Sequence, residues 1–202
     1  MTTGAVRRVE ISSLRQGAVL GAGGQGRVVA VDKYLIDGRW PAALKTYSGS
    51  VSLNVPALEK IVAFPDQLHP NDRDWLMEIT SWPWAIATEN GIVRGFLMRV
   101  VPSVYRFNFM TVTQGSRAML STVEFLLNPD SYVSRAGISI SERDRLNLLG
   151  TLAETIARLH ALCRIEQDDD PVDASKCDSS PHFASVDVSE ELKMLAGLAA
   201  SR

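Results

Sequence analysis

The alternation of hydrophobic and polar positions predicts a β-rich first half of the chain. Residues 27–36 (RVVAVDKYLI) and 40–47 (WPAALKTY) contain many β-branched and aromatic residues, and the turn-forming pair Asp37–Gly38 lies between them. A second pair of such runs flanks Asn90–Gly91, a strong short-range signal for a hairpin. We therefore expect two β-hairpins, each with a tight turn at its tip.

Between these hairpins, the spacing of apolar residues predicts two short helices. In SLNVPALEKIVAFP, Leu58, Ile61 and Val62 recur at helical spacing, with Pro56 suited to the first turn and Pro65 to the exit. In NDRDWLMEI a second helix is expected. Its predicted N-cap is Asn71.

Two further helices are predicted in the second half. Residues 115–128 (GSRAMLSTVEFLLN) are expected to form a helix that ends near Asn128–Pro129, and residues 141–163 form the strongest helical pattern in the chain, with Ser141 as the cap. The apolar stripe predicted for this last helix consists of Leu146, Leu149, Leu152, Ala153, Ile156 and Leu159.

Composition and charge narrow the class of protein. The 202 residues allow one large domain or two small ones; 46% are hydrophobic, 22% are charged and the net charge is −2, which gives no case for nucleic-acid binding. Two cysteines, Cys163 and Cys177, are too few for a disulfide framework, and no signal peptide or membrane span is evident. A cytoplasmic protein that binds neither membrane nor metal is expected.

The stretch GAGGQGRV, residues 21–28, carries the candidate chemistry. A GxGxxG pattern in a dinucleotide-binding domain opens a helix, whereas here β-branched residues follow, so the loop is expected to join two antiparallel strands. The next strand carries Ala43 and Lys45. A phosphate-binding loop and a plain hairpin with a flexible tip and a surface lysine are both compatible with this pattern.

In this order, the glycine loop, trailing valine and Ala-Leu-Lys strand resemble the small lobe of the protein-kinase-like superfamily. More narrowly, the chain resembles a bacterial serine/threonine-kinase-like group with a "WP … GFLM" hairpin, over about residues 14–165. The resemblance implies an α+β fold, with a small lobe (14–102) of a five-stranded antiparallel sheet plus a helix, followed by a truncated helical large lobe (103–165). The remaining segments are an N-terminal tail (1–13), an acidic Ser/Asp-rich linker (166–187) and a C-terminal helix (188–202).

The resemblance also implies an ATP site. Glycines would let backbone amides approach the phosphates, Val28 and Ala43 would flank the adenine, and Lys45 would contact the phosphates. Glu59 is the expected partner of Lys45, with Glu78 as the competitor. The full set of expected ATP-binding residues is Gly21, Ala22, Gly23, Gly24, Gln25, Gly26, Val28, Ala43, Lys45, Met98 and Val100.

The sequence departs from the family where phosphoryl transfer takes place. No Asp-Phe-Gly triplet occurs, and the last asparagine is Asn147, so no catalytic residue or magnesium ligand can be placed. We therefore expect a chain that binds Mg-ATP or ATP but is inactive as a kinase, either as a shortened copy of a longer kinase or as a non-catalytic nucleotide-sensing or protein-interaction module. A protein partner covering the 141–163 helix is expected in the latter case.

Overall fold

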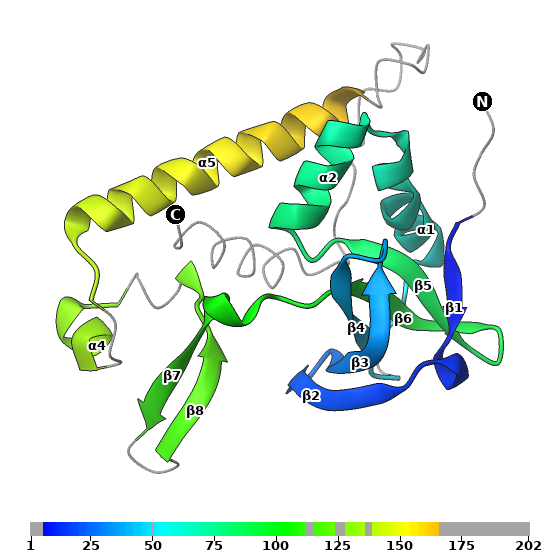
Figure 1. Ribbon diagram of the computed structural model, residues 1–202, viewed down its shortest axis with the longest axis horizontal. Helices are drawn as coiled ribbons and strands as arrows, with labels where there is room; N and C mark the ends of the chain where they lie inside the picture. Colours follow the sequence, from blue (N-terminus) through cyan, green and yellow to red (C-terminus); the bar gives the residue numbers. More distant parts are fainter. Residues whose placement is uncertain (1–5, 50, 112–114, 124–127, 136–138, 166–202) are drawn as a thin grey trace. The chain divides into compact units, whose positions relative to one another are not determined.

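The computed structural model describes residues 6–49, 51–111, 115–123, 128–135 and 139–165. The described chain has a mixed α+β fold, which confirms the expected class, and it divides into two compact units between Val100 and Val101 (Figure 1). The predicted acidic linker (166–187), the predicted C-terminal helix (188–202) and Cys177 lie outside the described residues.

The first unit contains a six-stranded sheet in the order β1-β5-β6-β4-β3-β2 (Figure 1). The five strands from β2 to β6 are antiparallel neighbours, as the alternating pattern and the hairpin turns indicated. The strands are β1 (Arg8–Glu10), β2 (Gln16–Gly23), β3 (Gly26–Ile36), β4 (Trp40–Tyr47), β5 (Pro83–Glu89) and β6 (Ile92–Arg99).

The sixth strand corrects the prediction of an N-terminal tail over residues 1–13. Strand β1 pairs in parallel with β5, and the short 3-10 helix η1 (Ile11–Ser13) follows it. A three-residue strand is too short to leave an alternating pattern in the sequence. Its formation depends on the open edge of β5, which only the folded sheet provides.

Both predicted hairpin turns are present in the structure. Asn90 and Gly91 have φ values of 52° and 78°, and Asp37 and Gly38 have values of 49° and 68°. Left-handed backbone at two successive positions suits Asn-Gly and Asp-Gly pairs, because asparagine, aspartate and glycine tolerate positive φ better than other residues. The turn chemistry therefore specified where the chain reverses.

Helices α1 (Val55–Ala63) and α2 (Pro70–Ile79) occupy the interval between β4 and β5, separated by the 3-10 helix η2 (Phe64–Gln67). The Asn54 side chain caps α1 by accepting from the Ala57 N–H at 3.1 Å. The predicted cap of α2 was wrong: His69, rather than Asn71, is the N-cap, because Pro70 takes the first helical position.

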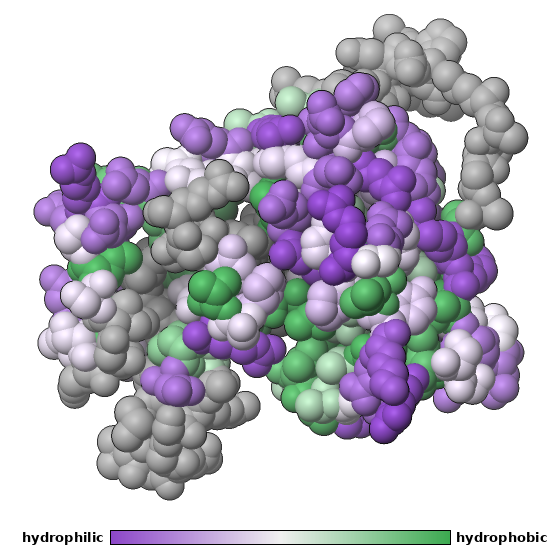
Figure 2. Space-filling model, viewed as in Figure 1, coloured by the Kyte–Doolittle hydropathy of each residue, from purple (hydrophilic) through white to green (hydrophobic). Residues whose placement is uncertain are grey.

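Hydrophobic side chains on one face of the sheet form the core of this unit. Their buried members come from four strands and from Met77 of α2, and Val9, Ile11 and Leu14 pack against them. Figure 2 shows hydrophobic residues gathered over β2 and β3, where Val19 and Leu35 are each 52% exposed, and hydrophilic residues over α1 and α2. The core residues are Val29, Val31, Ile36, Ala42, Leu44, Met77, Trp84, Ala85, Ala87 and Leu97.

The second unit corrects the first part of the helix predicted over residues 115–128, and residues 124–127 of that prediction lie outside the described residues. Gly115–Leu120 is a strand, β8, which pairs antiparallel with β7 (Arg106–Thr111). Glycine and serine at its start are weak helix formers, and β7 offers a complete set of backbone partners, so pairing overrides the local helical pattern. The unit also contains η3 (Ser103–Tyr105), α4 (Asp130–Arg135) and α5 (Glu142–Ile165).

Helix α5 begins at the expected cap. Ser141 Oγ accepts from the Asp144 N–H at 3.2 Å, and the Asp144 carboxylate accepts from the Ser141 N–H at 3.0 Å, a reciprocal capping box. The predicted apolar stripe was only partly right: Leu148 and Leu162 are the buried leucines, whereas Leu146 and Leu149 are 65% and 48% exposed. At about 100° per residue, Leu148 points almost opposite to Leu146, so the buried side of the helix is not the side on which the predicted stripe begins.

Candidate functional site

The glycine-rich stretch forms a tight β-hairpin turn between β2 and β3. Gly23 pairs with Gly26, which leaves Gly24 and Gln25 as the two turn residues. The end of β4 holds this turn: Ser48 donates its N–H to the Gln25 carbonyl at 2.9 Å and its hydroxyl to the Gly24 carbonyl at 3.2 Å. The expectation that the loop joins two antiparallel strands is confirmed.

The glycines of this turn differ in what the fold demands of them. A Cβ at Gly26 would lie 2.1 Å from the Thr46 carbonyl oxygen, so the close approach of β3 to β4 excludes a side chain there. A Cβ at Gly21, Gly23 or Gly24 would meet no atom within 4 Å. Glycine at these three positions is not required by packing, and it leaves backbone open to an approaching ligand.

The strand register brings most of the expected ATP-binding residues onto one face of the sheet. Residues directly opposite each other on paired strands share a face. Gly21 pairs with Val28, and Val28 pairs with Lys45, so these three form part of one row across the sheet. Ala43 and Met98 pair with each other in the adjacent row, two residues further along the strands and therefore on the same face.

Lys45 lies over aromatic rings in the middle of this face. Its ammonium nitrogen is 5.2 Å from the centre of the Tyr47 ring and 5.6 Å from that of Phe96, and the two rings are tilted at 55° to each other. These distances are in the range of cation–π attraction. Within the described part of the chain, no carboxylate lies in ion-pair contact with Lys45.

The expected partner of Lys45 has a different contact in the structure. Glu59, on α1, accepts a hydrogen bond from the Arg8 guanidinium of β1. Glu78, the competitor, is an exposed residue of α2 whose backbone carbonyl accepts from Arg99. The structure therefore brings neither glutamate to Lys45.

Two of the expected residues, Ala43 of β4 and Met98 of β6, are buried. The exposed fractions of Ala43 and Met98 are 1% and 6%, so the surface on which an adenine would rest is covered. The Val100 N–H donates to the Pro41 carbonyl at 2.8 Å. This amide is already bonded within the first unit, and an adenine would have to be recognised by other backbone groups nearby.

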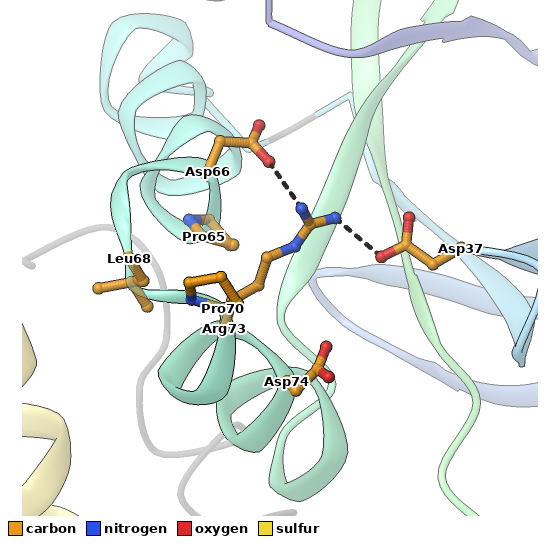
Figure 3. Close-up of a pocket in the computed structure, with 7 residues that line it drawn as sticks. All are labelled: Asp37, Pro65, Asp66, Leu68, Pro70, Arg73 and Asp74. Atoms are coloured by element: carbon orange, nitrogen blue, oxygen red, sulfur yellow. Dashed lines mark hydrogen bonds and ion pairs between the residues drawn. The ribbon is translucent and has the colours of Figure 1, made fainter.

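A cavity of about 360 Å³ lies elsewhere in the first unit, beside α2 (Figure 3). Arg73 reaches across its wall to Asp37 at 2.8 Å and to Asp66 at 3.7 Å, so the turn between β3 and β4 is joined to η2. The lining residues are Asp37, Pro65, Asp66, Leu68, Pro70, Arg73 and Asp74.

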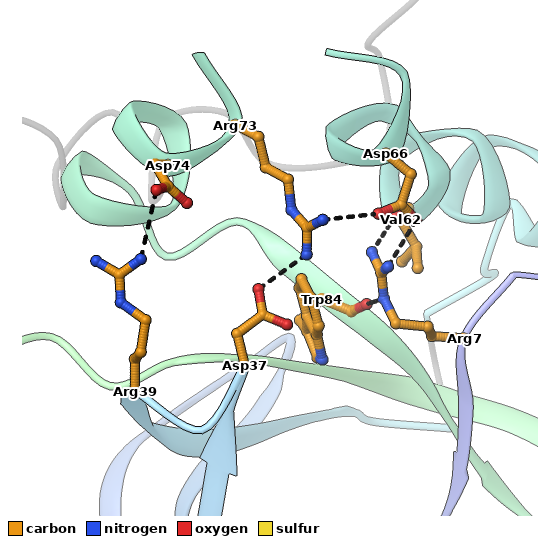
Figure 4. A network of polar contacts seen from close by, with 8 residues as sticks. All are labelled: Arg7, Asp37, Arg39, Val62, Asp66, Arg73, Asp74 and Trp84. Atoms are coloured by element: carbon orange, nitrogen blue, oxygen red, sulfur yellow. Dashed lines mark hydrogen bonds and ion pairs between the residues drawn. The ribbon is translucent and has the colours of Figure 1, made fainter. Parts of the chain in front are cut away.

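The polar network around this cavity connects the helices to the sheet (Figure 4). Arg7 lies 3.8 Å above the Trp84 ring and donates to Asp66 at 2.6 Å, to the Val62 carbonyl at 3.0 Å and to the Trp84 carbonyl at 2.8 Å. Each of the three guanidinium nitrogens of Arg7 donates to a protein acceptor, so this arginine stabilises the fold rather than presenting a charge to a ligand.

Two residues of the candidate site were missed by sequence reasoning. Arg8 lay in the supposed tail, and no local signal connects it with Glu59. Gly95 lies opposite Thr46, and a Cβ there would be 1.8 Å from the Lys45 carbonyl oxygen, so this glycine allows β6 to approach β4 beside Lys45. An isolated glycine inside the run IVRGFLM was the signal that could have identified Gly95.

The residues that the structure describes bring together no three His, Cys, Asp or Glu side chains that could hold a metal ion. Among the described helices, none is both long and apolar enough to cross a membrane.

Comparison of the chain with protein-family models, with curated proteins and with solved structures finds no match. The case for a function therefore comes from the geometry of the site.

Proposed function

We propose that the first unit is an ATP-binding domain of the protein-kinase-like type that binds nucleotide without transferring its phosphate. The observation that carries the proposal is the strand register, which aligns Gly21, Val28 and Lys45 in one row, with Ala43 and Met98 beside them. A glycine turn with open backbone, a cation and a small apolar surface together suit the phosphates and the base of a nucleotide.

Each feature has a defined role in this proposal. Backbone N–H groups near Gly23 and Gly24 approach the phosphates, and the Lys45 ammonium neutralises part of their charge. Val28 and Ala43 contact the adenine from one side, because both lie on the same face of the sheet. Because Ala43 and Met98 are buried, the residues above them have to move before the base can enter.

Phosphoryl transfer is not part of the proposal, because that chemistry depends on a base for the acceptor hydroxyl and on ligands that hold magnesium. The sequence after Asn147 supplies no Asp-x-x-x-x-Asn pattern and no Asp-Phe-Gly triplet. The proposed function therefore includes no phosphate acceptor. ATP is a ligand that the domain binds but whose phosphate it does not transfer.

Calorimetric titration of the chain with ATP, with and without magnesium, tests the proposal. We expect saturable binding in the natural chain and a loss of about tenfold or more in affinity in Lys45→Ala, because a hydrogen bond to a charged group contributes about 1.5–3 kcal/mol. Lys60→Ala is the matched control: it removes the same charge from an exposed position on α1 and should leave binding unchanged.

An absence of binding up to millimolar ATP would overturn the proposal. The glycine hairpin would then be architecture alone, and a β-rich protein-interaction module would be the better description. In that case Lys45→Ala would leave the binding of a protein partner intact.

A further inference from the structure

One row of directly opposed residues crosses all six strands of the first unit. Two of its members are cations: Lys45, in the middle of the sheet, and Arg8, on the edge strand β1. Ile86 and Phe96 lie between them and are 0% and 1% exposed. From β2 to β1 the row consists of Gly21, Val28, Lys45, Phe96, Ile86 and Arg8.

A single carboxylate, that of Glu59, is bound at the β1 end of this row. Helix α1 packs against β5, the strand next to β1, with Leu58 and Val62 buried. From this position Glu59 meets Arg8 rather than Lys45. The two side chains are 44% and 35% exposed, so their contact is an ion pair at the surface that can exchange.

The backbone that carries Arg8 is held firmly in place. The Ile86 N–H donates to the Arg7 carbonyl at 2.9 Å, and the Arg7 side chain is anchored on Trp84 and Asp66. Two residues later, Glu10 accepts from the Asn90 N–H at 2.6 Å. Arg8 is thus a fixed cation beside α1, available to Glu59 whenever the sheet is formed.

We propose that Arg8 is a positioning residue for the candidate phosphate site: it holds the Glu59 carboxylate at the edge of the sheet and so leaves the Lys45 ammonium available to an anionic ligand. The inference rests on the proposed function in one respect, that Lys45 is the group that meets the phosphates. The pairing of Arg8 with Glu59 also reverses the role first expected for Glu59.

The physical reason is the competition of two cations for one anion. Neighbouring strands are about 4.8 Å apart, so three strand spacings separate Arg8 from Lys45 by about 14 Å along the row. Glu59 and Lys45 both have long side chains that can shorten this gap. This separation is longer than one Debye length of about 8–10 Å, so the competition depends on a swing of the Glu59 side chain toward Lys45, which its contact with Arg8 prevents. Beside Lys45, the carboxylate would attract the ammonium and repel a phosphate.

The first test needs no nucleotide. The rate at which an amine-acylating reagent labels Lys45 is measured by mass spectrometry, with exposed Lys33 as the internal reference. Arg8→Ala should slow the labelling of Lys45 by about two- to fivefold, the range that an exposed ion pair provides. The double variant Arg8→Ala/Glu59→Gln should restore the rate, and Arg8→Lys, which keeps the charge, should behave as the natural chain does.

An unchanged rate in Arg8→Ala would overturn the inference, as would a slowed rate that Glu59→Gln does not reverse. Arg8→Gln, which keeps most of the length of the side chain, replaces Arg8→Ala if the latter fails to fold by circular dichroism. A purely structural role of Arg8 would affect Lys33 and Lys45 alike and would not be reversed by a change at Glu59.

The second test repeats the ATP titration with the same variants. Arg8→Ala should weaken binding by about two- to fivefold and the double variant should recover it. Binding that depends on Lys45 but is indifferent to Arg8 would support the proposed function and overturn the inference. A labelling effect in a chain that binds no ATP would support the exchange of Glu59 between the cations and overturn the proposed function.

Discussion

At the scale of single residues, Glu10 shows how one carboxylate joins distant segments. Its oxygens accept from the Thr88 hydroxyl at 2.7 Å and from the Asn90 N–H at 2.6 Å, which ties β1 to the turn between β5 and β6. The Thr88 hydroxyl, followed by the Asn90 N–H, holds the pKa of Glu10 below its ordinary value of 4.5. These bonds favour the charged form of the carboxylate.

The lowered pKa of Glu10 implies a pH dependence of stability with a definite sign. The contribution of Glu10 is fully present above the pKa of the unfolded chain and is lost as the pH falls through the lower pKa of the folded chain. Glu10→Gln should therefore show a smaller decrease in melting temperature between about pH 6 and pH 3 than the natural chain. Glu78→Gln, at an exposed site on α2, is the control and should follow the natural curve.

At the scale of an element, the glycine hairpin separates positions that the fold needs from positions that it does not. Gly26 faces the Thr46 carbonyl at a distance that excludes a Cβ, whereas Gly23 has open space around it. A plain hairpin would have no reason to keep glycine at both places. A hairpin that binds phosphates has such a reason, because a side chain at Gly23 would separate the ligand from the backbone amides.

Two alanine substitutions test this distinction. Gly26→Ala should lower the free energy of unfolding by about 1–3 kcal/mol, as overpacking does. Gly23→Ala should leave it unchanged or raise it by about 0.4–1 kcal/mol, because alanine restricts the unfolded chain. Denaturant titration measures both.

The same two variants also bear on ATP. If the hairpin binds phosphates, Gly23→Ala should fold normally and yet bind ATP more weakly. Full ATP affinity in that variant would count against a phosphate contact at this turn.

At the scale of the whole molecule, the division between Val100 and Val101 separates two units with different architectures. Every member of the hydrophobic core of the first unit lies between residues 29 and 97, and the partly buried residues packed against it begin at Val9. The sheet, its three hairpins and helices α1 and α2 are also contained in this unit. The first unit therefore contains the packing that its own stability requires.

A chain ending at Pro102 should consequently fold and unfold in one cooperative transition in urea. A chain ending at Glu89 is the control: it loses β6, which pairs with both β4 and β5, and should not fold. A broad, non-cooperative transition of the longer fragment would show that the second unit supplies contacts that the first unit needs.

The elements that were predicted correctly have strong local signals. Asn90–Gly91 and Asp37–Gly38 specify their turns by backbone preference, and Asn54 and Ser141 cap helices α1 and α5 through their own side chains. Strand β8 was predicted wrongly because its residues have only a weak local preference, and its partner β7 decided its conformation. Strand β1 was missed for the related reason that three residues carry no periodicity.

The chain alone was enough to predict the strand pairs around the glycine turn and the placement of Val28, Ala43 and Lys45 on them, because alternation and turn residues act over a few positions. Tertiary structure alone decided which groups meet across the sheet. Glu59 meets Arg8 because β1 adds to the edge of β5 beneath α1, and Lys45 is left over the rings of Tyr47 and Phe96. Such contacts join residues far apart in sequence, and no local pattern encodes the choice of one cation over another.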